Sequence, residues 1–307
     1  MEIGPCKLPL IGFGTYQLKG DDCVAAVCCA LRVGYRLIDT ARVYRNEKEV
    51  GVALKMMNEI PREEVFLTSK VAPTEQGEEA AYNAVRASLS DLDVEYIDLV
   101  LIHWPGKSKT PLRSKNNIEA RQASWRALIR AKREGLVRDI GVSNFTQKHL
   151  EDPTFYGGPV DQFPTSLLHK TCDIPPEESR CTPAVNQVEL HPLLSRLELR
   201  NYCSKRGIKV QAYSSLGQCD PRLMDSPALV QVCTEVCASK YAVLLSWALQ
   251  QGIAVIPRSR NPDNIHANLE AMSIALKEQS LLKEEHMQAL TGMDEDIHFC
   301  WNSNEVI

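Results

Sequence analysis

Short apolar runs alternate with amphipathic stretches along almost the whole chain. The apolar runs are rich in β-branched and aromatic residues, as is typical of strands that are buried on both faces of a parallel sheet. Eight such runs predict strands, at residues 9–15, 35–41, 65–71, 96–104, 137–144, 183–189, 208–216 and 253–259.

Apolar residues at helical spacing fill most of the intervals between these runs. Within 46–58, for example, Val50, Ala53, Leu54 and Met57 form one apolar stripe. Several of these stretches end in Lys or Arg followed by Gly, which is typical of a helix C-terminus. The pattern predicts helices over 21–34, 46–58, 78–91, 119–134, 195–206, 226–238 and 262–272, with one more early in 281–307.

Alternation of strand and helix from one end to the other predicts an α/β fold with an all-parallel sheet. Eight such units suit a closed (β/α)₈ TIM barrel, which we expect to form a single domain over residues 1–307. A doubly wound open sheet is the alternative, but no G-x-G-x-x-G follows any predicted strand. The segment 151–182, rich in Pro, Gly and charge, is predicted as a long loop with a short helix at 165–171, and 292–307 as an irregular tail.

Composition narrows the classes of function. The chain has 307 residues and a net charge of -4, and it has no run of basic residues that would indicate a nucleic-acid partner. It shows no signal-peptide pattern and no apolar stretch long enough to span a membrane, so a cytoplasmic location is expected. The 11 cysteines are irregularly spaced, which favours reduced thiols over disulfides and predicts no metal site.

Ionisable residues of complementary type fall at the ends of three neighbouring predicted strands. Asp39 ends the second strand, Lys70 the third and His103 the fourth, while Tyr44 follows Asp39 by five residues. Each has a plain structural explanation: a cap for Asp39, solvation for Lys70, packing for His103 and Tyr44. Chemistry in a parallel barrel nevertheless lies at the carboxyl ends of the strands, where all four would converge.

Their combined chemistry suits protonation of a carbonyl oxygen. An ammonium beside a phenol is expected to lower the phenol pKa from about 10 and make it a better acid. A carboxylate such as Asp39 would hold Lys70 in place, and a neutral imidazole at His103 would orient the carbonyl. No side chain is an evident activated nucleophile, so we expect a bound cofactor to deliver a hydride.

Eight motifs in order give the chain a resemblance to the aldo-keto reductase family over nearly its whole length. The resemblance implies a barrel that transfers a hydride from NADPH to an aldehyde or ketone, with Asp39, Tyr44, Lys70 and His103 as catalytic residues and Tyr44 as proton donor. The motifs are 12-GFGTYQL-18, 33-VGYRLIDTARVYRNEKEVGVAL-54, 68-TSKV-71, 98-DLVLIHWP-105, 140-IGVSNF-145, 184-AVNQVELHP-192, 211-QAYSSLG-217 and 255-VIPRS-259.

The same resemblance implies binding residues. Those for the cofactor are Gly14, Thr15, Asp39, Ser143, Asn144, Gln187, Tyr213, Ser214, Leu216, Arg258, Ser259 and Asn268. Among them, Ser143, Asn144 and Gln187 would hold the nicotinamide carboxamide, and Tyr213 would stack on the ring. Arg258 and Ser259 would bind the 2′-phosphate. Tyr16, Trp104 and Trp301 would line the substrate pocket.

The chain departs from the family pattern at the adenosine end of the expected cofactor site. Arg258 stands where many relatives have lysine, Asn264 where arginine is common, and Ala267 where glutamate is usual. NADPH is expected, and NADH is an open alternative. A monomer is expected, with a small-molecule carbonyl as partner. The alternative function is that of a cofactor-binding structural or regulatory protein with little turnover.

Overall fold

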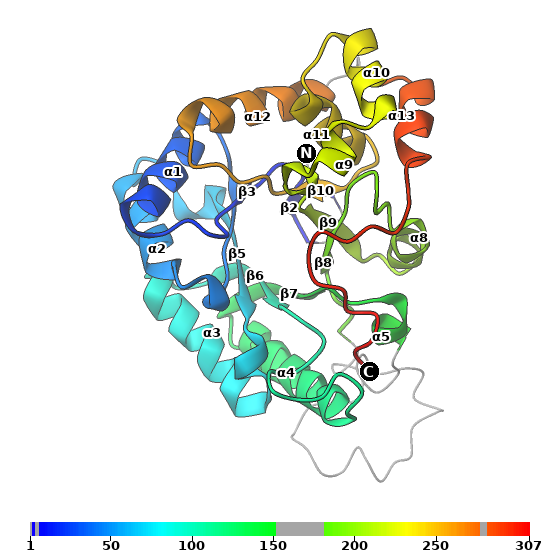
Figure 1. Ribbon diagram of the computed structural model, residues 1–307. Helices are drawn as coiled ribbons and strands as arrows, with labels where there is room; N and C mark the ends of the chain where they lie inside the picture. Colours follow the sequence, from blue (N-terminus) through cyan, green and yellow to red (C-terminus); the bar gives the residue numbers. More distant parts are fainter. Residues whose placement is uncertain (1, 4–5, 152–180, 277–280) are drawn as a thin grey trace.

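The computed structural model describes residues 2–3, 6–151, 181–276 and 281–307. Its centre is an eight-stranded parallel sheet in the order β10-β9-β8-β7-β6-β5-β4-β3 (Figure 1). A parallel bridge joins Ile11 to Val255, and the Gly12 N–H donates to the Val255 carbonyl at 2.9 Å. The first strand therefore meets the last, and the predicted (β/α)₈ barrel is confirmed.

The strands are buried along nearly their whole length, which explains their continuous apolar runs. The two strands at the closing seam are the shortest, with two residues each, so the predicted runs at 9–15 and 253–259 are much longer than the strands observed. The barrel strands are β3 (Phe13–Gly14), β4 (Leu37–Asp39), β5 (Phe66–Val71), β6 (Ile97–Ile102), β7 (Val137–Ser143), β8 (Val185–Glu189), β9 (Lys209–Tyr213) and β10 (Ala254–Val255).

Helices surround the barrel (Figure 1). The long ones are α1 (Gly20–Val33), α2 (Glu47–Met56), α3 (Glu78–Leu92), α4 (Asn116–Arg133), α8 (Leu197–Lys205), α10 (Pro227–Val236), α11 (Lys240–Leu249), α12 (Pro262–Ala275) and α13 (Glu284–Thr291). Short helical turns are η1 (Arg42–Tyr44), η2 (Arg62–Glu64), η3 (Pro73–Glu75), α5 (Gln147–Glu151), η5 (Gly217–Cys219) and α9 (Pro221–Met224).

Besides the short helical turns, helix α11 and a hairpin at the start of the chain were not predicted from the sequence. Helix α11 is buried at every position over 243–249, so it has little of the polar face that reveals a surface helix. The other is a small antiparallel hairpin of β1 (Glu2–Ile3) and β2 (Leu8–Pro9). Lys209, the first residue of β9, donates to the Cys6 carbonyl at 2.7 Å, which places this hairpin at the amino ends of the strands.

The C-terminal tail, residues 292–307, runs from α13 past the carboxyl ends of β8 and β7 towards α5 (Figure 1). It is anchored near its end, where the Ile307 carbonyl accepts from Arg121 at 2.7 Å. Most of the segment 151–182, including the short helix predicted at 165–171, lies outside the described residues.

Among the residues that the structure describes, no single helix is long and apolar enough to cross a membrane. Helices α10 and α11 meet that criterion only as a pair, bent by 93°.

Candidate active site

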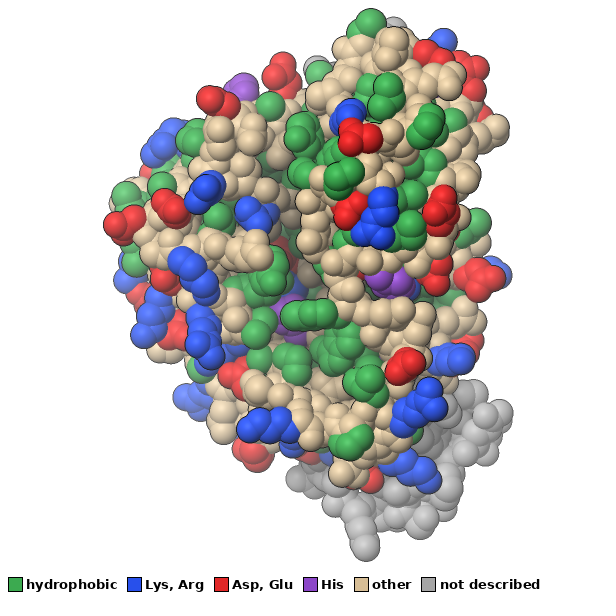
Figure 2. All heavy atoms as spheres, in the orientation of Figure 1, with side chains coloured by type: hydrophobic (Ala, Val, Ile, Leu, Met, Phe, Trp, Pro, Cys, Tyr) green, Lys and Arg blue, Asp and Glu red, His purple; other side chains and the backbone are tan. Residues whose placement is uncertain are grey.

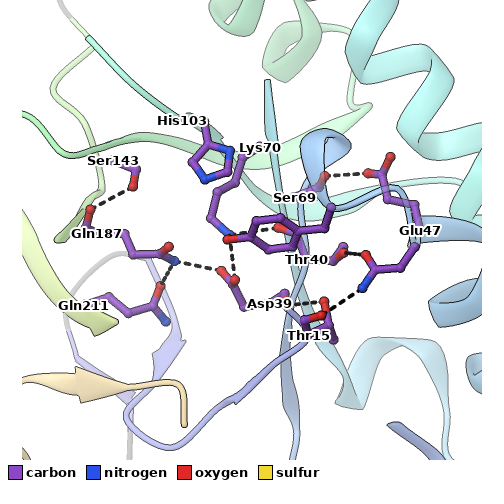
Figure 3. Close-up of polar contacts among 12 residues, drawn as sticks. Thr15, Asp39, Thr40, Glu47, Ser69, Lys70, His103, Ser143, Gln187 and Gln211 are labelled. Atoms are coloured by element: carbon purple, nitrogen blue, oxygen red, sulfur yellow. Dashed lines mark hydrogen bonds and ion pairs between the residues drawn. The ribbon is translucent and has the colours of Figure 1, made fainter. Parts of the chain in front are cut away.

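The four predicted catalytic side chains meet at the carboxyl ends of neighbouring strands. Asp39 is the last residue of β4, Lys70 is the next to last of β5, His103 directly follows β6, and Tyr44 ends η1. Strands β4, β5 and β6 are hydrogen-bonded neighbours, so residues far apart in the sequence converge (Figure 3).

Lys70 and Asp39 form a buried ion pair. The Lys70 Nζ lies 2.6 Å from Asp39 Oδ1, and the two side chains are 0% and 2% exposed. The same ammonium donates to the Thr40 carbonyl at 2.9 Å and to the Tyr44 hydroxyl at 3.4 Å. Burial lowers the pKa of Lys70, and the Asp39 carboxylate acts in the opposite direction. The three hydrogen bonds therefore fix the direction of the ammonium towards Tyr44.

The second oxygen of the Asp39 carboxylate is also engaged. Gln187 on β8 donates from Nε2 to Asp39 Oδ2 at 2.7 Å and lies at the same distance from Gln211 Oε1 on β9 (Figure 3). A buried carboxylate with both oxygens bonded is held in one orientation. Gln187 was predicted from the family resemblance as a nicotinamide contact; its bond to Asp39 was not foreseen.

Tyr44 lies among the ionisable groups and the other aromatic rings. Its ring centroid is 4.8 Å from Lys70 Nζ, 5.5 Å from the His103 ring and 5.1 Å from the Tyr16 ring. Burial and then the Asp39 carboxylate raise the pKa of Tyr44 well above its ordinary value. The expectation of a lowered pKa for Tyr44 is wrong for this structure, because burial raises this pKa and the Asp39 carboxylate acts in the same direction. The phenol is therefore protonated at neutral pH.

His103 is buried and neutral. Burial and then the Lys70 charge lower its pKa well below its ordinary value. Its Nδ1 has no hydrogen-bond partner among the described residues. Buried polar atoms are rarely left without a partner, so this ring suits a hydrogen bond with a bound ligand.

A buried amide holds the turn that presents Tyr44. Asn46 Nδ2 donates to the carbonyls of Thr15 and Leu18 at 2.9 and 3.1 Å, and its Oδ1 accepts from Thr40 Oγ1 at 2.8 Å. Asn46 precedes α2 but makes no side-chain cap bond there. Its position before a helix resembles a cap in the sequence, which is why this cross-linking role was missed.

Arg42 lies close to the site in the sequence and forms three ion pairs. Its guanidinium lies 2.9 Å from Glu47, 2.9 Å from Asp91 and 3.3 Å from Glu75. Glu47 in turn accepts from Ser69 Oγ at 2.6 Å (Figure 3). Arg42 therefore supports the wall of the barrel.

The residues expected at the nicotinamide end form a cluster that adjoins the catalytic one. Asn144 has a left-handed φ of 65° and donates to the His103 carbonyl at 3.0 Å. Its Oδ1 accepts from the Tyr213 hydroxyl at 2.7 Å, and Ser143 Oγ donates to the Gln187 carbonyl at 2.8 Å. The structure thus brings Ser143, Asn144, Gln187 and Tyr213 to one side of the catalytic residues.

The other predicted cofactor residues next to this cluster lie at the end of β3 and on the loops after β3 and β9. Thr15 donates to the Asp39 carbonyl at 2.9 Å, and Ser214 and Leu216 follow β9. Gly14 lies where β3 meets the segment after β10, since a Cβ there would be 2.8 Å from the Ile256 carbonyl oxygen.

The adenosine-end residues stand apart from both clusters. Arg258 and Ser259 follow β10, and Asn268 is half-buried on α12. Arg258 is exposed and donates to Gln17 Oε1 at 2.6 Å, and it forms no ion pair with any described residue. A guanidinium without a carboxylate partner fits an incoming phosphate group.

The three predicted substrate residues are aromatic and lie at the rim. Tyr16 is 50% exposed and Trp301 is 60% exposed, and Trp301 meets Trp104 edge to face at 6.0 Å between ring centroids. Figure 2 shows hydrophobic side chains gathered around a hollow on this face of the molecule. A cavity of about 530 Å³ between α5, α8 and the tail includes only Asn144 of the predicted site residues.

Comparisons with known proteins identify the family of the chain. The family model described as "Aldo/keto reductase family" matches residues 10–285. The chain is 36% identical to the glyoxal reductase of Bacillus subtilis (strain 168), over 90% of this chain and 88% of that protein. It is 33% identical to the glycerol 2-dehydrogenase (NADP(+)) of Saccharomyces cerevisiae (strain ATCC 204508 / S288c), over 98% and 94% respectively.

A solved structure gives the same result. The aldo-keto reductase MGS-M4, from a deep-sea metagenome library of the Medee basin, superposes with a TM-score of 0.78 at 32% identity, covering 98% of this chain and 96% of that one. The chain belongs to the aldo/keto reductase family and is an oxidoreductase of that family. The resemblance stated from the sequence motifs is confirmed.

Proposed function

We propose that this enzyme reduces aldehydes or ketones to alcohols with NADPH, and that Tyr44 donates the proton. The observation that carries the proposal is the contact of one protonated phenol with a buried ammonium and a neutral imidazole. A carbonyl oxygen that gains negative charge needs donors aimed at it, and this arrangement supplies two of them.

Each side chain has a distinct role in the proposed reaction. Bound NADPH supplies the hydride. Tyr44 releases its proton to the carbonyl oxygen, and the Lys70 ammonium 3.4 Å away stabilises the phenolate that forms. Asp39 holds Lys70 charged, and His103 donates an N–H that orients the carbonyl. The raised pKa of Tyr44 keeps its proton in place until charge develops on the substrate.

The cofactor assignment rests on the two groups of predicted binding residues. Asn144, Ser143 and Gln187 present amide and hydroxyl groups beside the catalytic cluster, where a carboxamide can bond. The guanidinium of Arg258, which has no carboxylate partner among the described residues, favours the extra phosphate of NADPH over NADH. The name of the yeast relative, which specifies NADP(+), supports the same choice.

The proposed substrates are aldehydes with an aromatic or compact carbon skeleton. The rings of Tyr16, Trp104 and Trp301 offer an apolar wall at the rim. The names of the relatives point to glyoxal and glycerol as small substrates of those proteins, which supports small carbonyls as a second group for this enzyme.

NADPH oxidation tests the proposal directly. Loss of NADPH absorbance with 4-nitrobenzaldehyde or methylglyoxal, together with recovery of the alcohol, is expected. A weaker reaction with NADH would support the role of Arg258. Tight NADPH binding without oxidation by either aldehyde would contradict the proposal and favour the cofactor-binding alternative.

We also propose a cytoplasmic monomer. The irregular spacing of the 11 cysteines supports a reducing compartment. A dimer in sedimentation at working concentration would contradict the monomer.

A further inference from the structure

One buried carboxylate holds the middle of the tail against the barrel. Glu189, the last residue of β8, is 1% exposed. Its Oε1 accepts the backbone N–H of Phe299 at 2.8 Å and that of Cys300 at 3.1 Å, and its Oε2 lies 3.2 Å from the same Cys300 nitrogen. The Glu189 carboxylate thus accepts hydrogen bonds from two tail N–H groups that, in a regular helix or strand, would bond to backbone carbonyls.

The Glu189 carboxylate is charged. Burial by itself would raise its pKa, but hydrogen bonds from His191 and from the Phe299 N–H outweigh that effect, and the pKa is lowered. His191 Nε2 lies 3.3 Å from Oε1, and His298 Nδ1 lies 3.6 Å from Oε2. Hydrogen bonds to an ionised acceptor are roughly twice as strong as those between neutral groups.

The opposite side of the same tail segment is held by the loop after β9. Gln218 Nε2 lies 3.3 Å from the Phe299 carbonyl and 2.9 Å from Cys300 Sγ. Ser214 Oγ lies 3.3 Å from Cys300 Sγ. The Phe299 ring packs against His191 at 4.8 Å between centroids. Phe299 and Cys300 are therefore fixed from both sides.

The next residue along the tail is not fixed in this way. Trp301 is 60% exposed, and its described ring contact is the edge-to-face one with Trp104. Trp104 directly follows His103, so the two indoles bound the rim beside the catalytic imidazole. The tail beyond Trp301 is anchored again only at Val306 and Ile307, five and six residues further on, among the described residues. The nearest described tethers of the Trp301 backbone to the barrel are therefore those of Phe299 and Cys300, the two residues before it.

We propose that Glu189 is a positioning residue for substrate selectivity, which acts by fixing the tail backbone so that Trp301 forms the outer wall of the substrate pocket. The inference rests on the carbonyl-reductase function proposed above. Without the carboxylate, two backbone N–H groups lose their acceptor and the segment 299–301 can shift. Substrates large enough to reach Trp301 would bind less well, whereas small ones that meet only Tyr44 and His103 would not.

A double-mutant cycle with two substrates tests this inference. For 4-nitrobenzaldehyde, Glu189→Ala and Trp301→Ala are each expected to raise KM about tenfold, the scale of one lost aromatic contact, with little change in kcat. For methylglyoxal, neither constant should change more than about twofold. The double variant should match Trp301→Ala, because Glu189 acts through Trp301. Multiplied losses, or equal losses for both substrates, would overturn the inference.

Two further variants guard against a merely structural effect. Glu189→Gln keeps an acceptor oxygen. In contrast to Glu189→Ala, it should therefore retain most of the affinity for 4-nitrobenzaldehyde. Gln218 is exposed and donates a hydrogen bond to the Phe299 carbonyl, so Gln218→Ala should fold normally. It should raise KM for 4-nitrobenzaldehyde by about threefold, as expected for the loss of one neutral hydrogen bond. If Glu189→Ala does not fold, Gln218→Ala decides, and an unchanged KM in that variant would contradict the inference.

Hydrogen exchange supplies a readout that does not depend on turnover. Amides of residues 298–302 should exchange faster in Glu189→Ala or Gln218→Ala than in the unmodified protein, while peptides from β5 should not change. Unchanged exchange in 298–302 would show that Glu189 does not hold the tail. If the unmodified protein reduces neither aldehyde, the proposed function fails together with the selectivity role, and exchange still decides whether the tether exists.

Discussion

The two ends of the proposed cofactor site are built in opposite ways. At the catalytic end, Lys70 and Asp39 are buried and every polar atom of the pair is engaged by a neighbour. At the adenosine end, Arg258 is exposed. Among the described residues, Ser259 bonds only within its own loop, where it accepts from the Asn261 N–H at 3.0 Å. No described hydrogen bond or ion pair joins Arg258 to the catalytic cluster.

The difference shows which part of a site a fold constrains. A buried charge is costly unless it is paired and hydrogen-bonded, so Asp39 and Lys70 have to occur together with residues that satisfy them. An exposed guanidinium carries no such demand, and exposed neighbours such as Asn264 and Ala267 can vary without loss of the fold. The unusual residues of this chain lie at the exposed end.

The largest expected effect is at the centre of the buried end. Tyr44→Phe removes the proposed proton donor and leaves the ring that packs against Tyr16 and His103. We expect kcat for carbonyl reduction to fall about 10³-fold, within the range for loss of a general acid. NADPH affinity, measured by fluorescence titration, should not change. Undiminished kcat would remove Tyr44 from the mechanism.

Breaking the buried ion pair should cost stability as well as turnover. Lys70→Met leaves the Asp39 carboxylate buried without its partner, so we expect the free energy of unfolding to fall by about 3 kcal/mol. The matched variant Lys70→Met/Asp39→Asn removes both charges and should recover most of that loss in urea unfolding. Equal instability of the two variants would show that an unpaired charge is not the cause.

At the exposed end, the expected effect is on cofactor choice alone. Arg258→Ala should raise KM for NADPH about tenfold, the size of one charge-assisted hydrogen bond, and leave KM for NADH unchanged. Melting temperature should not move, because the side chain is exposed. Arg260 is an exposed arginine two residues further along the chain, so Arg260→Ala is the matched control. A loss of NADPH affinity in that variant alone would transfer the phosphate-binding role to Arg260.

The most gradual expected effect, spread over a range of pH, is the pH dependence of stability that His103 contributes. Burial and the Lys70 charge lower the pKa of His103 in the folded state below the value of about 6.5 that it has in the unfolded chain. The stability associated with neutral His103 is therefore fully present above about pH 6.5. As pH falls below that value, the unfolded state binds the proton first, and the unfolding free energy should drop by up to about 1.4 kcal/mol per pH unit. His103→Gln should show a shallower slope between pH 6.5 and 5. An identical slope would exclude His103 as the source.

The sequence predicted the barrel and the meeting of four side chains because both follow from strand order. Asp39, Lys70 and His103 each end a strand, and neighbouring parallel strands bring their ends together. Contacts between loops, the effects of burial and long-range bonds to the tail are not contained in the strand pattern, and they were not predicted. The Asn46 bonds to Thr15 and Leu18 depend on how loops cross, and the shift in the Tyr44 pKa depends on burial. The Glu189 bonds to the tail join residues 110 positions apart, beyond the reach of any local motif.

The central claim is that Asp39, Lys70 and Tyr44 act as one proton-donating unit. It is tested most directly by measuring kcat for Tyr44→Phe, Lys70→Met and the double variant with one aldehyde, in protein whose folding is verified by circular dichroism. Since Lys70 is proposed to act through Tyr44, Lys70→Met should lower kcat about 10²-fold alone and less than about threefold in the Tyr44→Phe background. A further loss of about 10²-fold in the double variant would show that the two side chains act independently, and would contradict the account.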